Sequence, residues 1–192
     1  MDALLLSFVV IFVAELGDKS QLMAMTFATR FRFWTVLAAI TAATAVVHLG
    51  SVAVGALIGA SLPTTWINAA AGLAFVGFGI WTLRGDELSE QEESRAAAGG
   101  RSAFFAVAIA FFLAELGDKT MLATVTLAAD HSWFGTWLGS TLGMVAADAL
   151  AIGIGAVLGR KLPERIVRFG AAILFFVFGA WLIVEAVRAG LG

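Results

Sequence analysis

Long apolar stretches alternate with short polar segments along the whole chain. Six stretches are dominated by apolar residues, and they cover residues 4–28, 34–60, 66–83, 103–128, 133–159 and 166–187. Each approaches or exceeds the roughly 20 residues that an α-helix needs to cross the hydrocarbon core of a bilayer. The pattern therefore predicts an all-α membrane protein with six transmembrane helices.

One extended polar run interrupts this pattern between residues 84 and 101 (RGDELSEQEESRAAAGGR). Its charged and small residues offer too little apolar surface to form a packed core. We therefore expect a flexible linker at 84–101 that joins two halves, residues 1–83 and residues 102–192. Each half then contains three of the six predicted helices.

The two halves are related by a duplication with a constant offset of 100 residues. The segment 15–20 (ELGDKS) returns as 115–120 (ELGDKT), and Pro63 returns as Pro163. Other residues repeat in the same register without a gap: Gly55, Gly59, Phe75, Phe78, Gly79 and Trp81 return as Gly155, Gly159, Phe175, Phe178, Gly179 and Trp181. A unit with an odd number of crossings forces the next unit to enter the membrane from the opposite side. The sequence thus predicts two inverted three-helix repeats, an arrangement in which transporters bind substrate near the membrane midplane.

Composition agrees with a membrane protein and narrows the possible functions. The chain is 60% hydrophobic and only 14% charged, and its mean hydropathy is +0.95. The net charge of −2, without a clustered basic face, gives no reason to expect a nucleic-acid partner. The chain has no cysteine, which excludes thiolate metal ligands and a thiol nucleophile.

The two motifs place ionisable groups in the middle of apolar stretches. A charge near the centre of a bilayer costs at least about 2.5 to 3.5 kcal/mol on insertion scales, so such groups face one another or a water-filled path. On a continuous helix, Glu15, Asp18 and Lys19 would lie on one face. Gly17 and Gly117 could relax each helix and expose backbone carbonyls.

Two such helices, related by a pseudo-two-fold axis, would bring the motif acids together. The resulting cage of carboxylate oxygens suits a hard or borderline divalent cation, and its ligands would be Glu15, Asp18, Glu115 and Asp118. Ser20 and Thr120 are weaker candidate ligands.

Lys19 and Lys119 add two positive charges to the four carboxylates. The six groups sum to −2, which one divalent cation or two protons would neutralise. Carboxylates held close together titrate as a coupled set, so protons and metal could compete for the same site. The count permits this cycle without proving it.

A purely structural interpretation of the motifs is a buried ion-pair network that joins two helices. The excess acid in each copy argues against it, because a structural network does not need one. Asp148 and His48 occupy equivalent positions in the fifth and second predicted helices and are candidate supporting or proton-coupling groups. For Asp148 a packing role and a functional role are equally open. For His48 a packing role is favoured. Met23, Met25 and Met121 fit packing better than metal ligation.

The distribution of basic residues predicts the orientation. Nearly all basic residues outside the motifs lie on one side of the predicted topology. These residues are Arg30, Arg32, Arg84, Arg95, Arg101, Arg160, Lys161, Arg165 and Arg168, and the opposite side has Arg188. The positive-inside rule then places both termini outside and the linker in the cytoplasm.

The doubled motif E-x-G-D-K-[S/T], once in the first helix of each repeat, resembles that of the GDT family of calcium and manganese exchangers, also known as uncharacterised protein family 0016. The resemblance covers essentially the whole chain, and neither motif departs from the family pattern. It implies a cation/proton antiporter of the plasma (inner) membrane that exports manganese, with calcium as the other family substrate and no resident cofactor. It also implies that the acids at 15, 18, 115 and 118 are the functional residues, completed by the motif lysines and hydroxyls.

Two other function classes stay open from the sequence. A six-helix exporter of amino acids or similar solutes would also use inverted repeats, but it would need groups that recognise an amine and a carboxylate. An intramembrane enzyme fits poorly, because the chain offers two histidines, no cysteine, no tyrosine and a symmetric set of polar groups. Glycine pairs such as Gly55 and Gly59 allow either close packing within a monomer or a homodimer.

Overall fold

The computed structural model describes residues 3–84, 103–158 and 164–191. The predicted linker at 84–101 lies almost wholly outside these residues. The described residues form helices: α1 (Ala3–Glu15), α2 (Lys19–Ala28), α3 (Phe33–Ser61), α4 (Thr64–Arg84), α6 (Ala103–Glu115), α7 (Lys119–Asp130), α8 (Trp133–Leu158) and α9 (Glu164–Leu191). The predicted all-α class is therefore confirmed.

Four of the helices are long and apolar enough to cross a membrane, in the ranges Phe33–Ser61, Thr64–Arg84, Trp133–Gly155 and Phe169–Gly190. The prediction of single continuous helices over 4–28 and 103–128 is wrong. Each of these stretches contains two shorter helices, because the backbone leaves the helical conformation at the motif.

Proline chemistry sets the boundary between α3 and α4. Leu62 takes an extended conformation, with φ −124° and ψ 146°, as expected for a residue before proline. The carbonyl of Pro63 then accepts hydrogen bonds from the N–H groups of Trp66 and Ile67 and starts α4. Pro163, its counterpart in the second repeat, lies outside the described residues.

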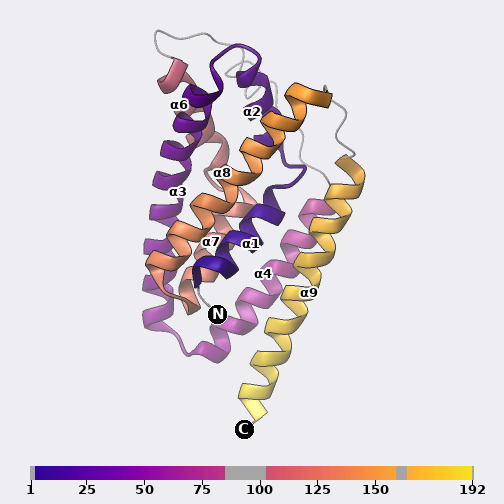
Figure 1. Ribbon diagram of the computed structural model, residues 1–192. Helices are drawn as coiled ribbons and strands as arrows, with labels where there is room; N and C mark the ends of the chain where they lie inside the picture. Colours follow the sequence, from indigo (N-terminus) through magenta and orange to yellow (C-terminus); the bar gives the residue numbers. More distant parts are fainter. Residues whose placement is uncertain (1–2, 85–102, 159–163, 192) are drawn as a thin grey trace.

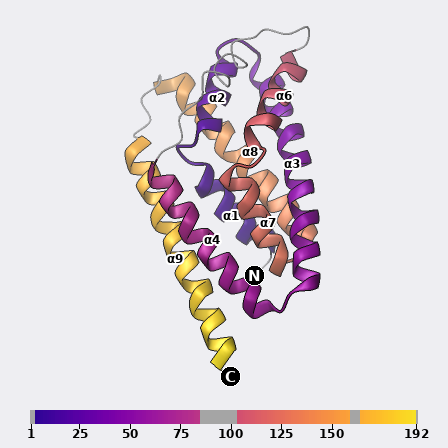
Figure 2. The ribbon, with the colours of Figure 1, turned by 180° about the vertical axis from the view of Figure 1, so that it is seen from behind.

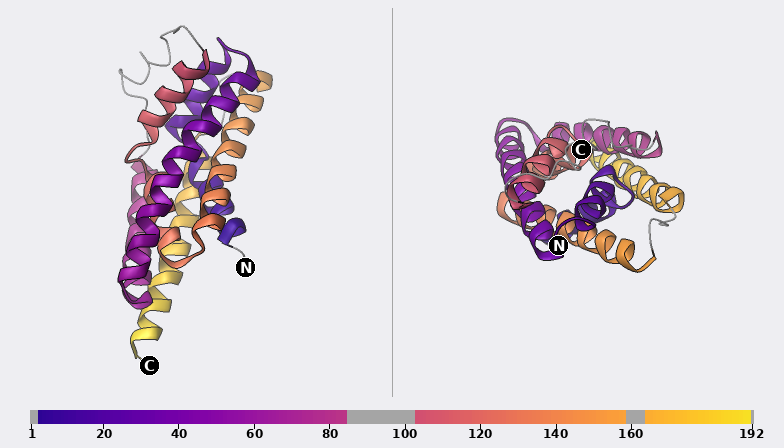
Figure 3. Two further views of the ribbon diagram at one scale, coloured as in Figure 1. Left: turned by 90° about the vertical axis from the view of Figure 1, so that its left-hand side faces the viewer. Right: turned by 90° about the horizontal axis from the view of Figure 1, so that it is seen from above.

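Each repeat packs its first helix against a long helix of the other repeat. The helix α1 lies along α8, and its counterpart α6 lies along α3, whereas α4 and α9 form a long pair at one side of the bundle (Figures 1 and 2). The helices α1 and α2 run along the molecule in the opposite direction to α6 and α7 (Figure 1). We call the end where α1 and α8 begin the α1/α8 end, and the opposite end the α3/α6 end. In the side view of Figure 3, α9 extends beyond the other helices at the C-terminal end.

Glycines allow the helix backbones to approach closely. A Cβ at Gly139 or Gly143 on α8 would meet the backbone of α1 at Leu4 or Phe8. A Cβ at Gly55 or Gly59 on α3 would likewise meet backbone atoms of α7. These two glycines of the first GxxxG pair therefore serve packing within the chain.

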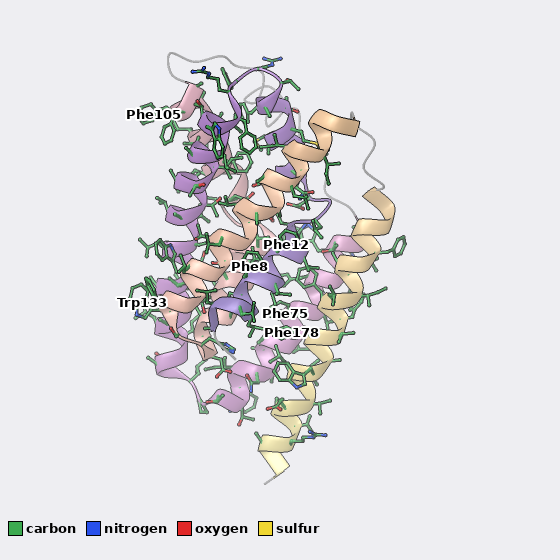
Figure 4. All side chains as sticks on the ribbon, viewed as in Figure 1. Phe8, Phe12, Phe75, Phe105, Trp133 and Phe178 are labelled. Carbon is green, nitrogen blue, oxygen red and sulfur yellow. The ribbon has the colours of Figure 1, made fainter. Side chains whose placement is uncertain are left out.

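Equivalent residues of the two repeats touch each other. The hydroxyl of Thr44 donates to Sδ of Met144 at 3.1 Å, and the rings of Phe75 and Phe175 lie 5.9 Å apart. Phe75 also packs edge-to-face on Phe178, with ring centroids 4.8 Å apart (Figure 4). Contacts between equivalent positions are what a pseudo-two-fold axis between the two halves would produce.

Large apolar side chains cover the outside of the bundle. Trp34, Trp66, Leu57 and Leu73 are 76%, 70%, 70% and 66% exposed. A surface this apolar is the mark of a protein that meets lipid, and exposed tryptophans near helix ends suit the membrane interface.

Candidate functional site

The two motifs form breaks between half-helices. The helix α1 ends at Glu15 and α2 begins at Lys19, while α6 ends at Glu115 and α7 begins at Lys119. Gly17 and Gly117 have φ values of 77° and 81°, in the left-handed region that glycine adopts without steric cost. The sequence analysis expected these glycines to relax each helix, and the structure has a full break at both.

The expectation that Glu15, Asp18 and Lys19 share one face of a continuous helix is wrong. Asp18 is extended, with φ −85° and ψ 165°, and precedes the first residue of α2. Asp118 takes the same position before α7, where its side chain accepts a hydrogen bond from the N–H of Thr120 at 3.5 Å. Each aspartate therefore lies at the positive end of a helix dipole, which favours a carboxylate.

Two side chains accept hydrogen bonds from the glycines of these breaks: Gln21, which the sequence analysis did not identify, and Met121, which it treated as a packing residue. The N–H of Gly17 donates to Oε1 of Gln21 at 2.9 Å, and the N–H of Gly117 donates to Sδ of Met121 at 3.1 Å. Nε2 of Gln21 also donates to the carbonyl of Ala147 on α8 at 3.1 Å. Both residues lie four positions after their glycine, and that repeated spacing is the signal that could have found them.

The aspartate of each motif pairs with the lysine of the other. Lys119 donates a short, buried hydrogen bond to Asp18, and Nζ of Lys19 lies 3.6 Å from Oδ1 of Asp118. The Lys119 side chain is 3% exposed and the Lys19 side chain is 16% exposed. The two pairs thus have the same connectivity, but the lysine of the Lys19 pair is more exposed than that of the Lys119 pair.

The motif glutamates lie buried beside these pairs. Thr120 donates to Oε2 of Glu115 at 3.0 Å, whereas its counterpart Ser20 donates to Asp18 at 3.3 Å. Both carboxylate oxygens of Glu15 are buried and have no hydrogen-bond partner in the described part of the chain. The carboxyl of Glu15 interacts electrostatically with Glu115 and Asp18, so the four motif acids belong to one buried charge cluster.

Asp148 belongs to the same buried charge cluster, whereas His48 is a buried side chain for which no interaction with the motif acids is seen among the described residues. Asp148 is fully buried on α8, its two oxygens have no hydrogen-bond partner among the described residues, and its charge interacts with that of Asp18. His48 is buried at the equivalent place on α3. Its Nδ1 has no hydrogen-bond partner in the described part of the chain.

The carboxylates do not yet converge on one point in this arrangement. Within the ranges that the structure describes, no three Asp, Glu or His side chains form a group that could hold a metal ion as they stand. The four-carboxylate cage stays a prediction. The methionines follow the packing expectation in part: Met23 is in the apolar core and Met25 packs on Gly155, while Met121 accepts the amide of Gly117.

Apolar helices around buried, oppositely charged side chains, with two half-helix breaks at the centre, define an integral membrane protein with a polar site in its interior. Known proteins make the class specific. The chain matches the family described as "Divalent cation/proton antiporter GDT1" twice, over residues 3–90 and 103–190. The chain belongs to this family, which is one of transporters and not of enzymes, so the resemblance inferred from the doubled motif is confirmed.

Relatives of this chain occur in bacteria and plants. It is 33% identical over 180 residues to a Vibrio cholerae protein named "Putative manganese exporter", a match that covers 92% of this chain and 88% of the relative. It is 30% identical over 184 residues to a GDT1-like protein of Synechocystis, covering 86% and 89%. A chloroplastic GDT1-like protein of Oryza sativa subsp. japonica is 33% identical over 213 residues, covering 95% and 62%. No solved structure gives a significant match.

Proposed function

We propose that this protein is a secondary active transporter that exports a divalent metal cation in exchange for protons. Mn²⁺ is the first candidate and Ca²⁺ the second. The observation that carries the proposal is the reciprocal pairing of Asp18 with Lys119 and of Asp118 with Lys19 between two half-helix breaks. The name of the Vibrio cholerae relative supports manganese.

The metal site in this proposal consists of Glu15, Asp18, Glu115 and Asp118, with Ser20 and Thr120 as weaker ligands. The lysines occupy the positions of counter-ions to the aspartates while no cation is bound. An arriving divalent cation would displace Lys19 and Lys119 from the aspartates and draw the four carboxylates together. Oxygen donors of this kind are the ones that Ca²⁺ and Mn²⁺ prefer.

Protons return the site to its starting state. Four carboxylates and two ammonium groups carry a net charge of −2. One divalent cation or two protons balance this charge, so each excludes the other from a buried site. Asp148 and His48 are the candidate supporting groups. Asp148 is the better placed of the two, because its charge interacts with that of Asp18.

The proposed topology has six crossings as two inverted repeats, residues 1–83 and 102–192. In it, α1 with α2 and α6 with α7 form the two broken crossings, with their breaks at the midplane. Both termini and the α1/α8 end face outward, and the linker at 84–101 is cytoplasmic in the plasma (inner) membrane. The opposite directions of α1–α2 and α6–α7 support this arrangement (Figure 1). The packing of Gly55 and Gly59 inside the chain favours a monomer over a homodimer joined at that pair.

Transport by the purified protein tests the proposal. Proteoliposomes would be supplied with Mn²⁺, Ca²⁺, Mg²⁺ or radiolabelled amino acids, and uptake compared with liposomes that contain the Asp18→Asn/Asp118→Asn protein. We expect Mn²⁺ or Ca²⁺ flux that the double variant lacks. Amino-acid flux without divalent flux would overturn the proposal in favour of a small-solute exporter.

A further inference from the structure

Among the described residues, several buried hydroxyl groups lie between the motifs and the α1/α8 end, and apolar groups take their equivalent positions toward the α3/α6 end. Between the motif and the α1/α8 end, four fully buried positions carry a hydroxyl, while the positions 100 residues away in the other half carry an alkyl group. The pairs are Ser7 and Val107, Thr124 and Ala24, Thr136 and Val36, and Ser140 and Ile40, all with 0% exposure. The α1/α8 end and the α3/α6 end of the bundle are therefore built from equivalent helices, but their interiors differ in polarity.

The alkyl members of these pairs form a continuous apolar core. Val36, Ile40, Val107 and Ala24 belong to one cluster of buried side chains together with Met23. A cavity lined by such groups stays dry. The half of the bundle toward the α3/α6 end is therefore closed to water in this arrangement.

Two of these four hydroxyls lack the partner that a helix normally provides, whereas Thr124 donates to the carbonyl of Thr120 at 2.8 Å and Ser140 to that of Trp137 at 3.2 Å. Thr26, Thr41 and Ser51 each donate to the carbonyl four residues earlier. Ser7 and Thr136 have no hydrogen-bond partner in the described part of the chain. A buried hydroxyl without a partner costs about 1 to 3 kcal/mol, and ordered water is the usual means of satisfying it.

Thr141 and its counterpart Thr41 are identical residues whose hydroxyls differ in burial and hydrogen bonding. Thr41 is exposed and donates to the carbonyl of Leu37 at 2.7 Å. Thr141 is buried, and its hydroxyl has no hydrogen-bond partner among the described residues. The difference follows from the surroundings in each half, because the residue type is the same.

The hydroxyls of α8 lie on a line along the helix that leads to Asp148. Thr136, Ser140, Met144 and Asp148 recur every four residues and so form one ridge of the helix. All four are fully buried. The ridge begins near the α1/α8 end and stops at Asp148.

Neighbouring positions show where this ridge lies. Gly139 and Gly143 contact α1, and Trp137 donates from Nε1 to the carbonyl of Ala45 on α3 at 2.9 Å. At 100° per residue, Ser140 falls between these two contact faces. The ridge therefore faces the interior of the bundle, between α1 and α3.

We propose that these hydroxyls hold a file of water molecules that conducts protons between the α1/α8 end and the buried carboxylates. Ser7 and Thr136 can donate to a water and all four hydroxyl oxygens can accept from one, so the hydroxyls hold the waters in place while the proton passes from one water to the next. The glycine contacts of α8 with α1 leave the hydroxyls fully buried, so the file is too narrow for a hydrated metal ion. This inference rests on the proposed antiport. It gives protons a path from the α1/α8 end to the carboxylates that is separate from the path of the metal ion.

Two buried methionines test the presence of water without any transport assay. Met144 lies on the hydroxyl ridge, where it also borders a second apolar cluster that contains Ile11 and Phe75, and Met23 lies in the apolar cluster with Val36 and Ile40; both methionines are 0% exposed. X-ray radiolysis of the wild-type protein in lipid nanodiscs produces hydroxyl radicals from internal water, which oxidise nearby methionine to the sulfoxide. We expect Met144 to be oxidised several-fold faster than Met23, as read by mass spectrometry. Equal rates would overturn the water file.

Substitution by the counterpart residues tests the proton route. In Thr136→Val/Ser140→Ile the hydroxyls become the residues that the other half carries at the equivalent positions. We expect oxidation of Met144 to fall to the rate of Met23. Proton flux driven by a Mn²⁺ gradient should fall about tenfold, as when one hydrogen bond of the file is lost, while Mn²⁺ binding stays unchanged. Thr41→Val is the control, and it should leave all three measurements unaltered.

The outcomes separate this inference from the proposed function. If the wild-type protein shows no coupling between Mn²⁺ and protons, the antiport fails, and the methionine measurement still decides the hydration. If coupling is present and the double variant conducts protons at the wild-type rate, the hydroxyl route is overturned. If the double variant does not fold, Ser7→Val supplies the same comparison on α1.

Discussion

At the residue scale, charge pairs with charge across the two motifs. Asp18 and Asp118 each lie beside the lysine of the other repeat, and the glutamates are buried next to them. In apolar surroundings an unpaired carboxylate is costly, so lysines are required whenever the cation is absent. In the proposed cycle the motif therefore supplies both the ligands and the counter-ions that replace the cargo.

Neutralising any one motif acid should stop transport without unfolding the protein. Asp18→Asn, Asp118→Asn, Glu15→Gln and Glu115→Gln each remove a ligand that the opposing repeat cannot supply, so we expect severe loss of Mn²⁺ flux. Asp148→Asn should weaken flux less. Asp130→Asn, at the exposed end of α7, is the matched control and should transport normally. Wild-type flux in any two of the four motif variants would rule out a shared site.

Removing Lys119 should lower the free energy of unfolding more than removing Lys19, because the two lysine–aspartate pairs differ in burial. Lys119→Met leaves Asp18 as a buried carboxylate without its partner, a change that costs about 3 to 5 kcal/mol in buried pairs. Lys19→Met removes a longer pair whose lysine is partly exposed, so it should cost less. Thermal unfolding in detergent measures both. A larger loss in Lys19→Met than in Lys119→Met would contradict the described geometry.

At the scale of the elements, hydropathy identified where the helices lie but not where two of them break. Averaging over about 19 residues merges α1 with α2 and α6 with α7, because three non-helical residues barely change the mean. The break depends on the positive φ of Gly17 and Gly117, which is a local property of the backbone. For the same reason, the motif side chains could not be assigned correctly to one face of a continuous helix. The hydrogen bonds from the Gly17 and Gly117 amides to Gln21 and Met121 were not expected either.

Gly117→Ala should destabilise the protein through the backbone alone. A Cβ at Gly117 would meet nothing within 4 Å, so only the φ of 81° opposes a side chain. We expect a loss of about 1 to 3 kcal/mol in the free energy of unfolding. Gly50→Ala on α3 is the control, because it also has open space but lies within a helix, where alanine is favoured. Equal stability of the two variants would mean that the break is not needed.

At the scale of the whole molecule, the 100-residue offset in the sequence corresponds to contacts across a pseudo-two-fold axis. Thr44 with Met144 and Phe75 with Phe175 lie on it. The duplication and the meeting of the two motifs could be predicted, because the register repeats without a gap. The differences between the halves could not, because they depend on which side chains face the interior once the helices pack.

The topology of the molecule can be measured directly in this cysteine-free chain. Ser94→Cys and Ser132→Cys should react with an impermeant thiol reagent from opposite sides of the membrane. We expect Ser132→Cys to react in intact cells and Ser94→Cys only after the membrane is opened, as the positive-inside rule requires. Reaction of both from one side would contradict the inverted repeat.

The coupling of metal to protons is the central claim, and flux in vesicles with a clamped membrane potential tests it most directly. Two protons carry the same charge as one divalent cation, so the proposed exchange of two protons for one cation would be electroneutral. We predict that an imposed pH gradient drives Mn²⁺ against its own gradient, that collapse of the pH gradient abolishes this flux, and that a change of potential alone has almost no effect. Mn²⁺ flux that follows the potential and ignores the pH gradient would contradict the account.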